Sequence, residues 1–205
     1  MKHIRRIPFT ILFLSIMVLA NWFAGTLAGT LPAETLSNWG ISHQTVVTGD
    51  LARLITGTFL SHDLGMFLRQ LIFAGAVIGY FEWHGSTLRT AITYFSIDIV
   101  GSVIVLFAVV PLVAAIPEIG QADARATLDV GMSAGGFGLI GAILASWPHK
   151  WLLLGAVVAA IVVKVWYDLD VIADSAHLIC LLIGFAVQQT LSVRSRSWDR
   201  KEGLR

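Results

Sequence analysis

The sequence predicts an all-α membrane protein in which six helices cross the bilayer as one bundle. Of its 205 residues, 56% are hydrophobic and only 13% are charged, and the mean hydropathy is +0.78. Water-soluble domains of this size are less apolar, so the expected solvent is a lipid bilayer. Most of the seven tryptophans stand at the ends of apolar runs, as in an interfacial aromatic belt. We expect one domain, with a core at 7–191 and a basic tail at 192–205.

The first expected span runs from Ile7 to about Thr26, directly after the basic start at 1–6. This apolar run is long for a signal peptide and lacks an A-x-A cleavage site, so we expect it to be retained. The segment Leu27–His62 is a long loop that carries many apolar side chains. A fully solvated loop would be more polar, so we expect this one to lie half-buried at the membrane interface with short helices.

Five further apolar runs predict the remaining spans, and short polar segments separate them. The expected spans are about Asp63–Trp83, Leu88–Ile116, Ser133–Trp147, Trp151–Trp166 and Ile172–Leu191. A second polar loop, Pro117–Asp129, leads into the fourth span, and an acidic link at 168–170 leads into the sixth. The third run is long enough for a tilted helix.

Basic residues determine the expected topology. With six spans, ten of the 14 lysines and arginines fall on one side: Lys2, Arg5, Arg6, Arg89, Lys150, Arg194, Arg196, Arg200, Lys201 and Arg205. By the positive-inside rule this side is the cytoplasm, so both termini are expected there. The predicted location is a bacterial inner (plasma) membrane, crossed several times.

Few cofactor chemistries fit the sequence. There is one cysteine, the six histidines lack H-x-x-x-H spacing, and no phosphate-binding glycine motif follows a strand pattern. We therefore expect no metal, no other cofactor and no nucleic acid partner. The bilayer itself is the first expected partner.

A candidate nucleophile lies in the glycine-rich stretch 131–138. The apolar run Ser133–Trp147 contains 15 residues, so a helix over it would rise about 22 Å, less than the hydrocarbon core of about 30 Å. Such a helix can begin inside the protein, with Ser133 in its first turn. A hydroxyl beside unpaired N–H groups and within reach of water is a suitable setting for a nucleophile. A small-residue face for close helix packing is the simpler explanation.

His177 is a candidate general base for this serine. It is the one histidine inside an expected span, near the outer end of the sixth, at a depth similar to that of Ser133. A Ser–His pair is the minimum for nucleophilic acyl transfer. Small residues at Ala176 and Gly184 would let the fourth and sixth helices approach closely. Phe137, one turn after Ser133, would pack against the imidazole. The alternative is that His177 only bonds another helix.

These motifs resemble those of the rhomboid intramembrane serine proteases. The family's fourth span carries a G-x-S-G-x-x-F-G-like motif, which 131–138 resembles, and its sixth span carries A-H-x-x-G-x-x-x-G, which 176–184 resembles. Arg53, Thr56 and Glu82 match further family positions in the first outer loop and the second span. The resemblance covers 7–191 and implies hydrolysis of transmembrane or juxtamembrane segments of single-span membrane proteins.

The resemblance also implies the supporting residues, and several of these depart from the family. The second-span oxyanion histidine and asparagine correspond to Met66 and Gln70, and the glycine after the serine is Ala134. Methionine cannot donate a hydrogen bond, whereas glutamine can. Gln70 and the Ser133 N–H are therefore the expected oxyanion donors, with Gly131 and Ala134 beside them.

Two other functions remain open at this stage. Ala134, Met66 and Ala52, which replaces a family tryptophan, would also suit a rhomboid-like pseudoprotease that binds transmembrane helices without cutting them. Asp98 lies near the middle of the third span, where a carboxyl group is costly, and a small transporter or channel could use it as a proton relay. A structural role for Asp98, through Ser96 or Ser102, is the simpler expectation.

Overall fold

The computed structural model describes residues 7–116 and 124–202, with side chains described up to 192. Within these ranges, regular secondary structure is helical apart from two isolated β-bridges. The helices are α1 (Pro8–Ala24), α2 (Ala33–Trp39), α3 (His43–Val47), α4 (Arg53–Thr56), α5 (Leu64–His84), α6 (Thr87–Ile104), α7 (Val110–Ala114), α8 (Ser133–Ala145), α9 (Lys150–Tyr167) and α10 (Val171–Glu202). Short 3₁₀ turns follow α1 and α4.

Four helical stretches in the described ranges are long and apolar enough to cross a membrane. They are Leu64–His84, Thr87–Ala114, Lys150–Tyr167 and Val171–Ser192, and α1 and α8 are shorter apolar helices. Large apolar side chains cover the outer surface of the bundle, for example Phe23, Ile72 and Leu152, each at least 74% exposed. Water would penalise such a surface and lipid would not, so this is a multi-pass membrane protein.

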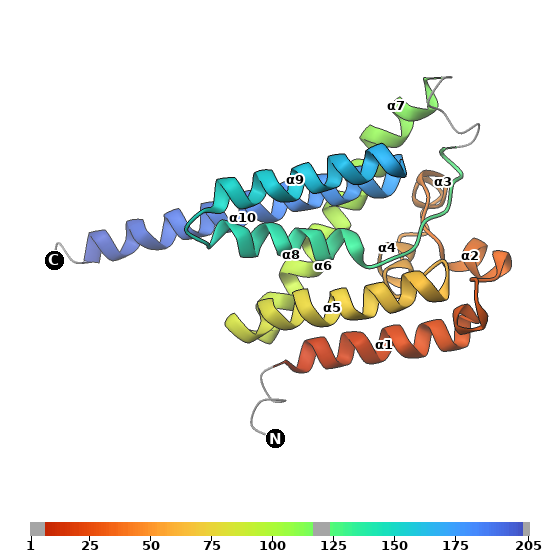
Figure 1. The fold of residues 1–205 in the computed structure, drawn as a ribbon, viewed down its shortest axis with the longest axis horizontal. Coiled ribbons are helices and arrows are strands. Elements are labelled where there is room, and N and C mark those ends of the chain that lie inside the picture. Colours follow the sequence, from red (N-terminus) through yellow and green to blue (C-terminus); the bar gives the residue numbers. More distant parts are fainter. Residues whose placement is uncertain (1–6, 117–123, 203–205) are drawn as a thin grey trace.

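Helix α8 occupies the centre of the bundle (Figure 1). It contacts α5, α6, α9 and α10, most extensively α10. The start of α1 and the end of α10 lie at one end of the bundle, and the short helices α2–α4 lie at the other (Figure 1). Ser133, the first residue of α8, is therefore at the end covered by the α2–α4 loop.

Glycines allow the close approach of α8 and α10. A Cβ atom at Gly184 of α10 would lie 2.7 Å from the carbonyl carbon of Gly138, and one at Gly141 would lie 2.8 Å from the Phe185 nitrogen. Both distances are too short for real side chains, so only glycine fits at either position. The close helix contact expected at Gly184 is thus confirmed, and it fixes α10 against the helix that carries Ser133.

The expected third span is one helical stretch, Thr87–Ala114, that changes its hydrogen-bond pattern part-way along. A π-helical turn, Val105–Val109, separates α6 from α7. Pro111 explains it, because proline lacks an N–H and its ring collides with the carbonyl group four residues earlier, that of Phe107. Helix α10 is also longer than expected, since it continues beyond Leu191 to Glu202.

The long loop before α5 contains short helices, as expected, and Arg53 fixes it. Its guanidinium group donates to the carbonyl oxygens of Ser37 and Gly40 and pairs with Asp50. Residues 1–6, 117–123 and 203–205 lie outside the described ranges. The basic start, part of the second polar loop and the end of the tail are among these residues.

The opposite end of the bundle is held by a second polar centre, around Glu82 of α5. Its carboxyl oxygens accept hydrogen bonds from the Phe9 and Thr10 nitrogens and from the Thr10 and Thr87 hydroxyl groups, at 2.7 to 2.9 Å. Glu82 is 1% exposed. It thereby joins α1, α5 and α6 at the far end from Ser133.

Candidate active site

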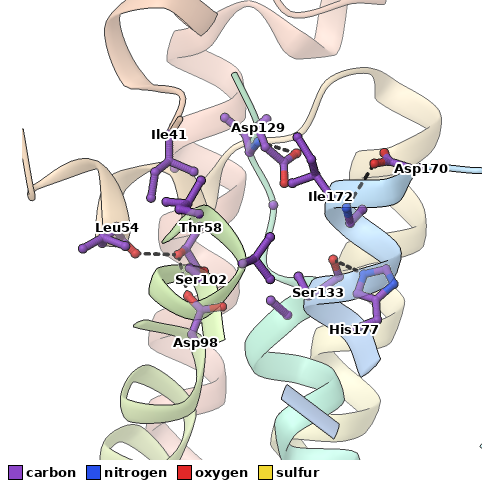
Figure 2. Close-up of a pocket in the computed structure, with 18 of the residues that line it drawn as sticks. Ile41, Leu54, Thr58, Asp98, Ser102, Asp129, Ser133, Asp170, Ile172 and His177 are labelled. Carbon is purple, nitrogen blue, oxygen red and sulfur yellow. Dashed lines mark hydrogen bonds between the residues drawn. The ribbon is translucent and has the colours of Figure 1, made fainter. Parts of the chain in front are cut away.

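Ser133 and His177 meet across two helices. The hydroxyl oxygen of Ser133, in the first turn of α8, lies 2.8 Å from Nε2 of His177, in α10 (Figure 2). That distance is a hydrogen bond. With the proton on Nδ1, Nε2 accepts from the Ser133 hydroxyl, which is the arrangement a general base requires.

Phe137 orients the imidazole. Its ring stacks on the His177 ring with centroids 4.3 Å apart and planes inclined by 23°. Phe137 lies one turn after Ser133 on the same face of α8, so its ring reaches the imidazole that is bonded to the Ser133 hydroxyl. The contact expected from the sequence is present. Among the described residues no carboxyl group bonds the His177 ring, so aromatic packing is what orients it.

The first two N–H groups of α8 have no acceptor among the described residues. In the described part of the chain, the N–H groups of Ser133 and Ala134 make no hydrogen bond, whereas Gly135 N–H donates to Asp98 and Gly136 N–H to the Met132 carbonyl. The first N–H groups of any helix lack internal partners. Here these are the Ser133 and Ala134 N–H groups, and they lie in the turn that carries the candidate nucleophile.

Gln70 supplies a third donor. It is 6% exposed, and its Oε1 accepts a 2.7 Å hydrogen bond from the Ser61 hydroxyl. This bond directs the amide nitrogen toward Gly131, where a Cβ atom would lie only 2.6 Å from Nε2. Gly131 has φ 140°, a conformation that also favours glycine. No acceptor among the described residues binds Gln70 Nε2, so this donor remains available beside Gly131, two residues before Ser133.

A buried asparagine anchors the serine that orients Gln70. The side-chain amide of Asn21, in α1, accepts from the Ser61 backbone nitrogen at 3.0 Å and donates to the Phe59 carbonyl oxygen at 2.8 Å. Asn21 and Ser61 are both fully buried. Sequence reasoning missed both residues, because neither lies within a recognisable motif.

Met66 takes no part as a donor. Its sulfur accepts the backbone N–H of His62 at 3.4 Å, and its methyl group lies near Gly131. A thioether has no proton to donate. The donor set therefore consists of Gln70 and backbone N–H groups.

A cavity of about 150 Å³ opens beside the pair. Its lining includes both members of the pair and the polar side chains Thr58, Asp98, Ser102 and Asp170 (Figure 2). The lining is mixed, and its polar groups can bind a few water molecules in a space of this size. Water can thus reach the hydroxyl and the imidazole at this depth.

His62 and Asp129 form the rim of this cavity. His62 Nε2 lies 3.3 Å from Asp129 Oδ1, and both side chains are 38% exposed. The hydrogen bond to Asp129 raises the pKa of His62 above its ordinary value of 6.5, against the opposing effect of burial. The pair joins the loop before α5 to the segment that leads into α8.

The partners of Asp98 differ from those expected. Its carboxyl oxygens accept from the Thr58 hydroxyl at 3.0 Å and from the Gly135 N–H at 2.8 Å, rather than from Ser96 or Ser102. Both oxygens are thereby engaged in contacts between helices. This arrangement favours a structural role over a proton relay.

One other buried carboxyl group, that of Asp174, pairs with a lysine. Lys164 of α9 lies 3.0 Å from Asp174 of α10, one turn before His177. In the described ranges no group of three or more His, Cys, Asp or Glu side chains could hold a metal ion.

The chain matches no family model, and no curated protein is significantly similar to it.

Proposed function

We propose that this chain is a six-span, rhomboid-type intramembrane serine protease with both termini in the cytoplasm. It hydrolyses a peptide bond in a transmembrane or juxtamembrane segment of a single-span membrane protein. The observation that carries the proposal is the 2.8 Å distance between Ser133 Oγ and His177 Nε2. A chain that uses α8 only for packing has no need for this pairing beside a polar cavity.

Helices α1 and α8 complete the six spans of this proposal. Helix α1 has 17 residues and rises about 26 Å, close to the hydrocarbon thickness. Helix α8 has 13 residues and rises about 20 Å, so it begins below the outer interface. Other protein elements surround its first turn, which is the condition under which irregular backbone is tolerated within a membrane.

The first half of the reaction forms an acyl-enzyme. The Ser133 oxygen attacks the scissile carbonyl carbon while His177 Nε2 takes the hydroxyl proton. Negative charge develops on the carbonyl oxygen, where the Ser133 and Ala134 N–H groups and the Gln70 amide donate hydrogen bonds. His177 then gives its proton to the amine nitrogen, the C–N bond breaks, and the amine fragment leaves.

The second half releases the other fragment. A water molecule from the cavity loses a proton to His177 and attacks the ester carbonyl carbon. The tetrahedral intermediate collapses, the Ser133 oxygen recovers the proton from the imidazolium, and a carboxylic acid leaves. The cycle consumes one water molecule and one peptide bond and needs no metal ion or redox partner.

A fluorophosphonate probe tests the nucleophile without a known substrate. The detergent-solubilised full chain is expected to form a P–O bond to Ser133, with loss of fluoride and with His177 as base. Ser133→Ala should abolish labelling. Ser146→Ala, at the opposite end of α8, is the matched control and should label like the wild type.

The pseudoprotease is the competing function, and Met66 is the observation in its favour, because it removes one donor that the family uses. Losing one oxyanion donor costs on the order of 10² to 10³ in rate. Folded wild-type protein that stays unlabelled, with a cooperative thermal transition as proof of folding, would establish the binder. Labelling that depends on Ser133 would establish the enzyme.

A further inference from the structure

Asp98 is a buried carboxyl group that the reaction above does not use. It lies in α6, its residue is 3% exposed, and it faces the cavity opposite Ser133 and His177 (Figure 2). Burying such a group is costly unless hydrogen bonds compensate. Its two bonds, to Thr58 and to Gly135 N–H, both lead to segments that surround the candidate nucleophile.

The first turn of α8 needs an acceptor from elsewhere. A helix is normally capped by the side chain of the residue before it, which accepts the N–H of the second or third helical residue. That residue is Met132 here, and its side chain makes no cap. Gly135 is the third helical residue, so Asp98 provides from α6 the cap that Met132 cannot.

A second bond from α6 holds the same turn. The hydroxyl group of Tyr94, one turn before Asp98, donates to the Met132 carbonyl oxygen at 2.8 Å. The Tyr94 and Asp98 bonds therefore fix the residue before Ser133 and the residue two positions after it. Gly135 permits this approach, since a Cβ atom there would lie 2.7 Å from the Tyr94 ring and 3.1 Å from the Asp98 Cβ.

The loop side of the same network is also fixed. The Thr58 hydroxyl lies 3.0 Å from Asp98 and 3.3 Å from the Leu54 carbonyl oxygen, so its single proton is shared between these two acceptors. Its neighbour Gly57 accepts the backbone N–H of Gly131 at 3.0 Å. The segment from 131 to 135 is therefore held from the loop at one end and from α6 at the other.

We propose that Asp98 is a positioning residue for Ser133. By accepting the Gly135 N–H, it fixes the first turn of α8, directs the Ser133 hydroxyl toward His177, and leaves the Ser133 and Ala134 N–H groups for the substrate carbonyl oxygen. This inference rests on the proposed protease function. Positioning accounts for both hydrogen bonds of the Asp98 carboxyl group, which a role as proton relay does not.

Labelling kinetics with the fluorophosphonate probe test this role. Asp98→Ala should lower the maximal labelling rate about 100-fold, since a misplacement near 1 Å has an effect of this size. The probe concentration at half-maximal rate should change little, because the probe still binds. Asp98→Asn should restore most of the rate, because its amide can accept from Gly135 N–H and donate to Thr58.

Glu82→Ala is the matched control, because it removes a buried, hydrogen-bonded carboxyl group at the far end of the bundle. It should reduce thermal stability, yet the folded fraction should label at the wild-type rate. If Asp98→Ala does not fold, Thr58→Val provides the test. It leaves the carboxyl group one partner and should lower the maximal rate about tenfold.

The outcomes separate the two proposals. Wild-type protein that is folded but unlabelled would overturn the protease function and this inference with it. Labelled wild type together with a wild-type maximal rate in folded Asp98→Ala, or in folded Thr58→Val, would overturn the inference alone. Equal losses in Asp98→Ala and Glu82→Ala would also overturn it, since they would indicate a general loss of structure.

Discussion

Gly184→Ala should separate the two helices that carry the Ser–His pair. The added methyl carbon would lie 2.7 Å from the Gly138 carbonyl carbon and 3.1 Å from its Cα. Carbon atoms in contact prefer about 3.5 Å or more, so α8 and α10 must move apart by about 1 Å. The obstacle is backbone, which cannot change rotamer to give way.

That displacement is large compared with the tolerance of the pair. If it reaches the end of the helices that carries the pair, the Ser133 to His177 distance grows from 2.8 Å to about 3.8 Å, beyond a hydrogen bond. We expect the maximal labelling rate to fall about 100-fold, or about 3 kcal/mol in activation free energy. Overpacking should also cost about 1–3 kcal/mol in the free energy of unfolding.

Gly155→Ala is the matched control for this substitution. Gly155 lies within α9, and a Cβ atom there meets no heavy atom within 4 Å. Alanine is the better helix former, so this variant should label normally and unfold at an equal or higher temperature. The reasoning is refuted if folded Gly184→Ala labels as fast as the wild type, because the α8–α10 contact would then not set the geometry of the pair.

Three further predictions concern the surroundings of the pair. Ser61→Ala should lower the maximal labelling rate about tenfold, by freeing the Gln70 amide to rotate, and adding Gln70→Leu should cause little further loss if the two act together. Phe137→Leu keeps apolar bulk but loses the stacked ring, so its labelling rate should fall several-fold, and an unchanged rate would show that packing does not orient the imidazole. Protonated His62 is stabilised by Asp129 in the folded state, so this contribution to stability is present below about pH 6.5 and is lost as the pH rises through the raised pKa. The thermal midpoint of the wild type should therefore fall between pH 6 and pH 9 by more than that of His62→Gln.

Hydrophobic patterning was sufficient to predict most helices of this chain, because each lies between polar segments and apolar length is a strong signal in membrane proteins. It was also sufficient to predict that α8 begins at Ser133, since the run is too short to start at the surface. The spacing of Phe137 from Ser133 predicted the stacked contact with His177. These features depend on distances along a single helix or on the depth of helix ends.

The polar network around the pair could not be predicted in the same way. Asp98 and Gly135 are 37 residues apart, and Asn21 and Ser61 are 40 apart, so their contacts depend on how the helices are rotated against one another. Periodicity locates a face of a helix but not the partner of one polar side chain. The π-helical turn at 105–109 is different. Pro111 predicts a break in the regular α-helical hydrogen bonding before it, but packing decides which form the break takes.

The unpaired donors beside Ser133 are the strongest argument against a purely structural site. Gln70 is buried, and a buried polar group without a partner costs about 1–3 kcal/mol, so a bundle selected only for stability would pair its amide nitrogen. The chain caps Gly135 with a carboxyl group from another helix, yet among the described residues the Ser133 and Ala134 N–H groups and the Gln70 amide nitrogen have no acceptor. Cavity water can bind these donors at rest, and a carbonyl oxygen that gains negative charge would bind them more strongly. A binder that only holds transmembrane helices gains nothing from free donors near a hydroxyl that is bonded to an imidazole, whereas acyl transfer uses such donors to stabilise the oxyanion.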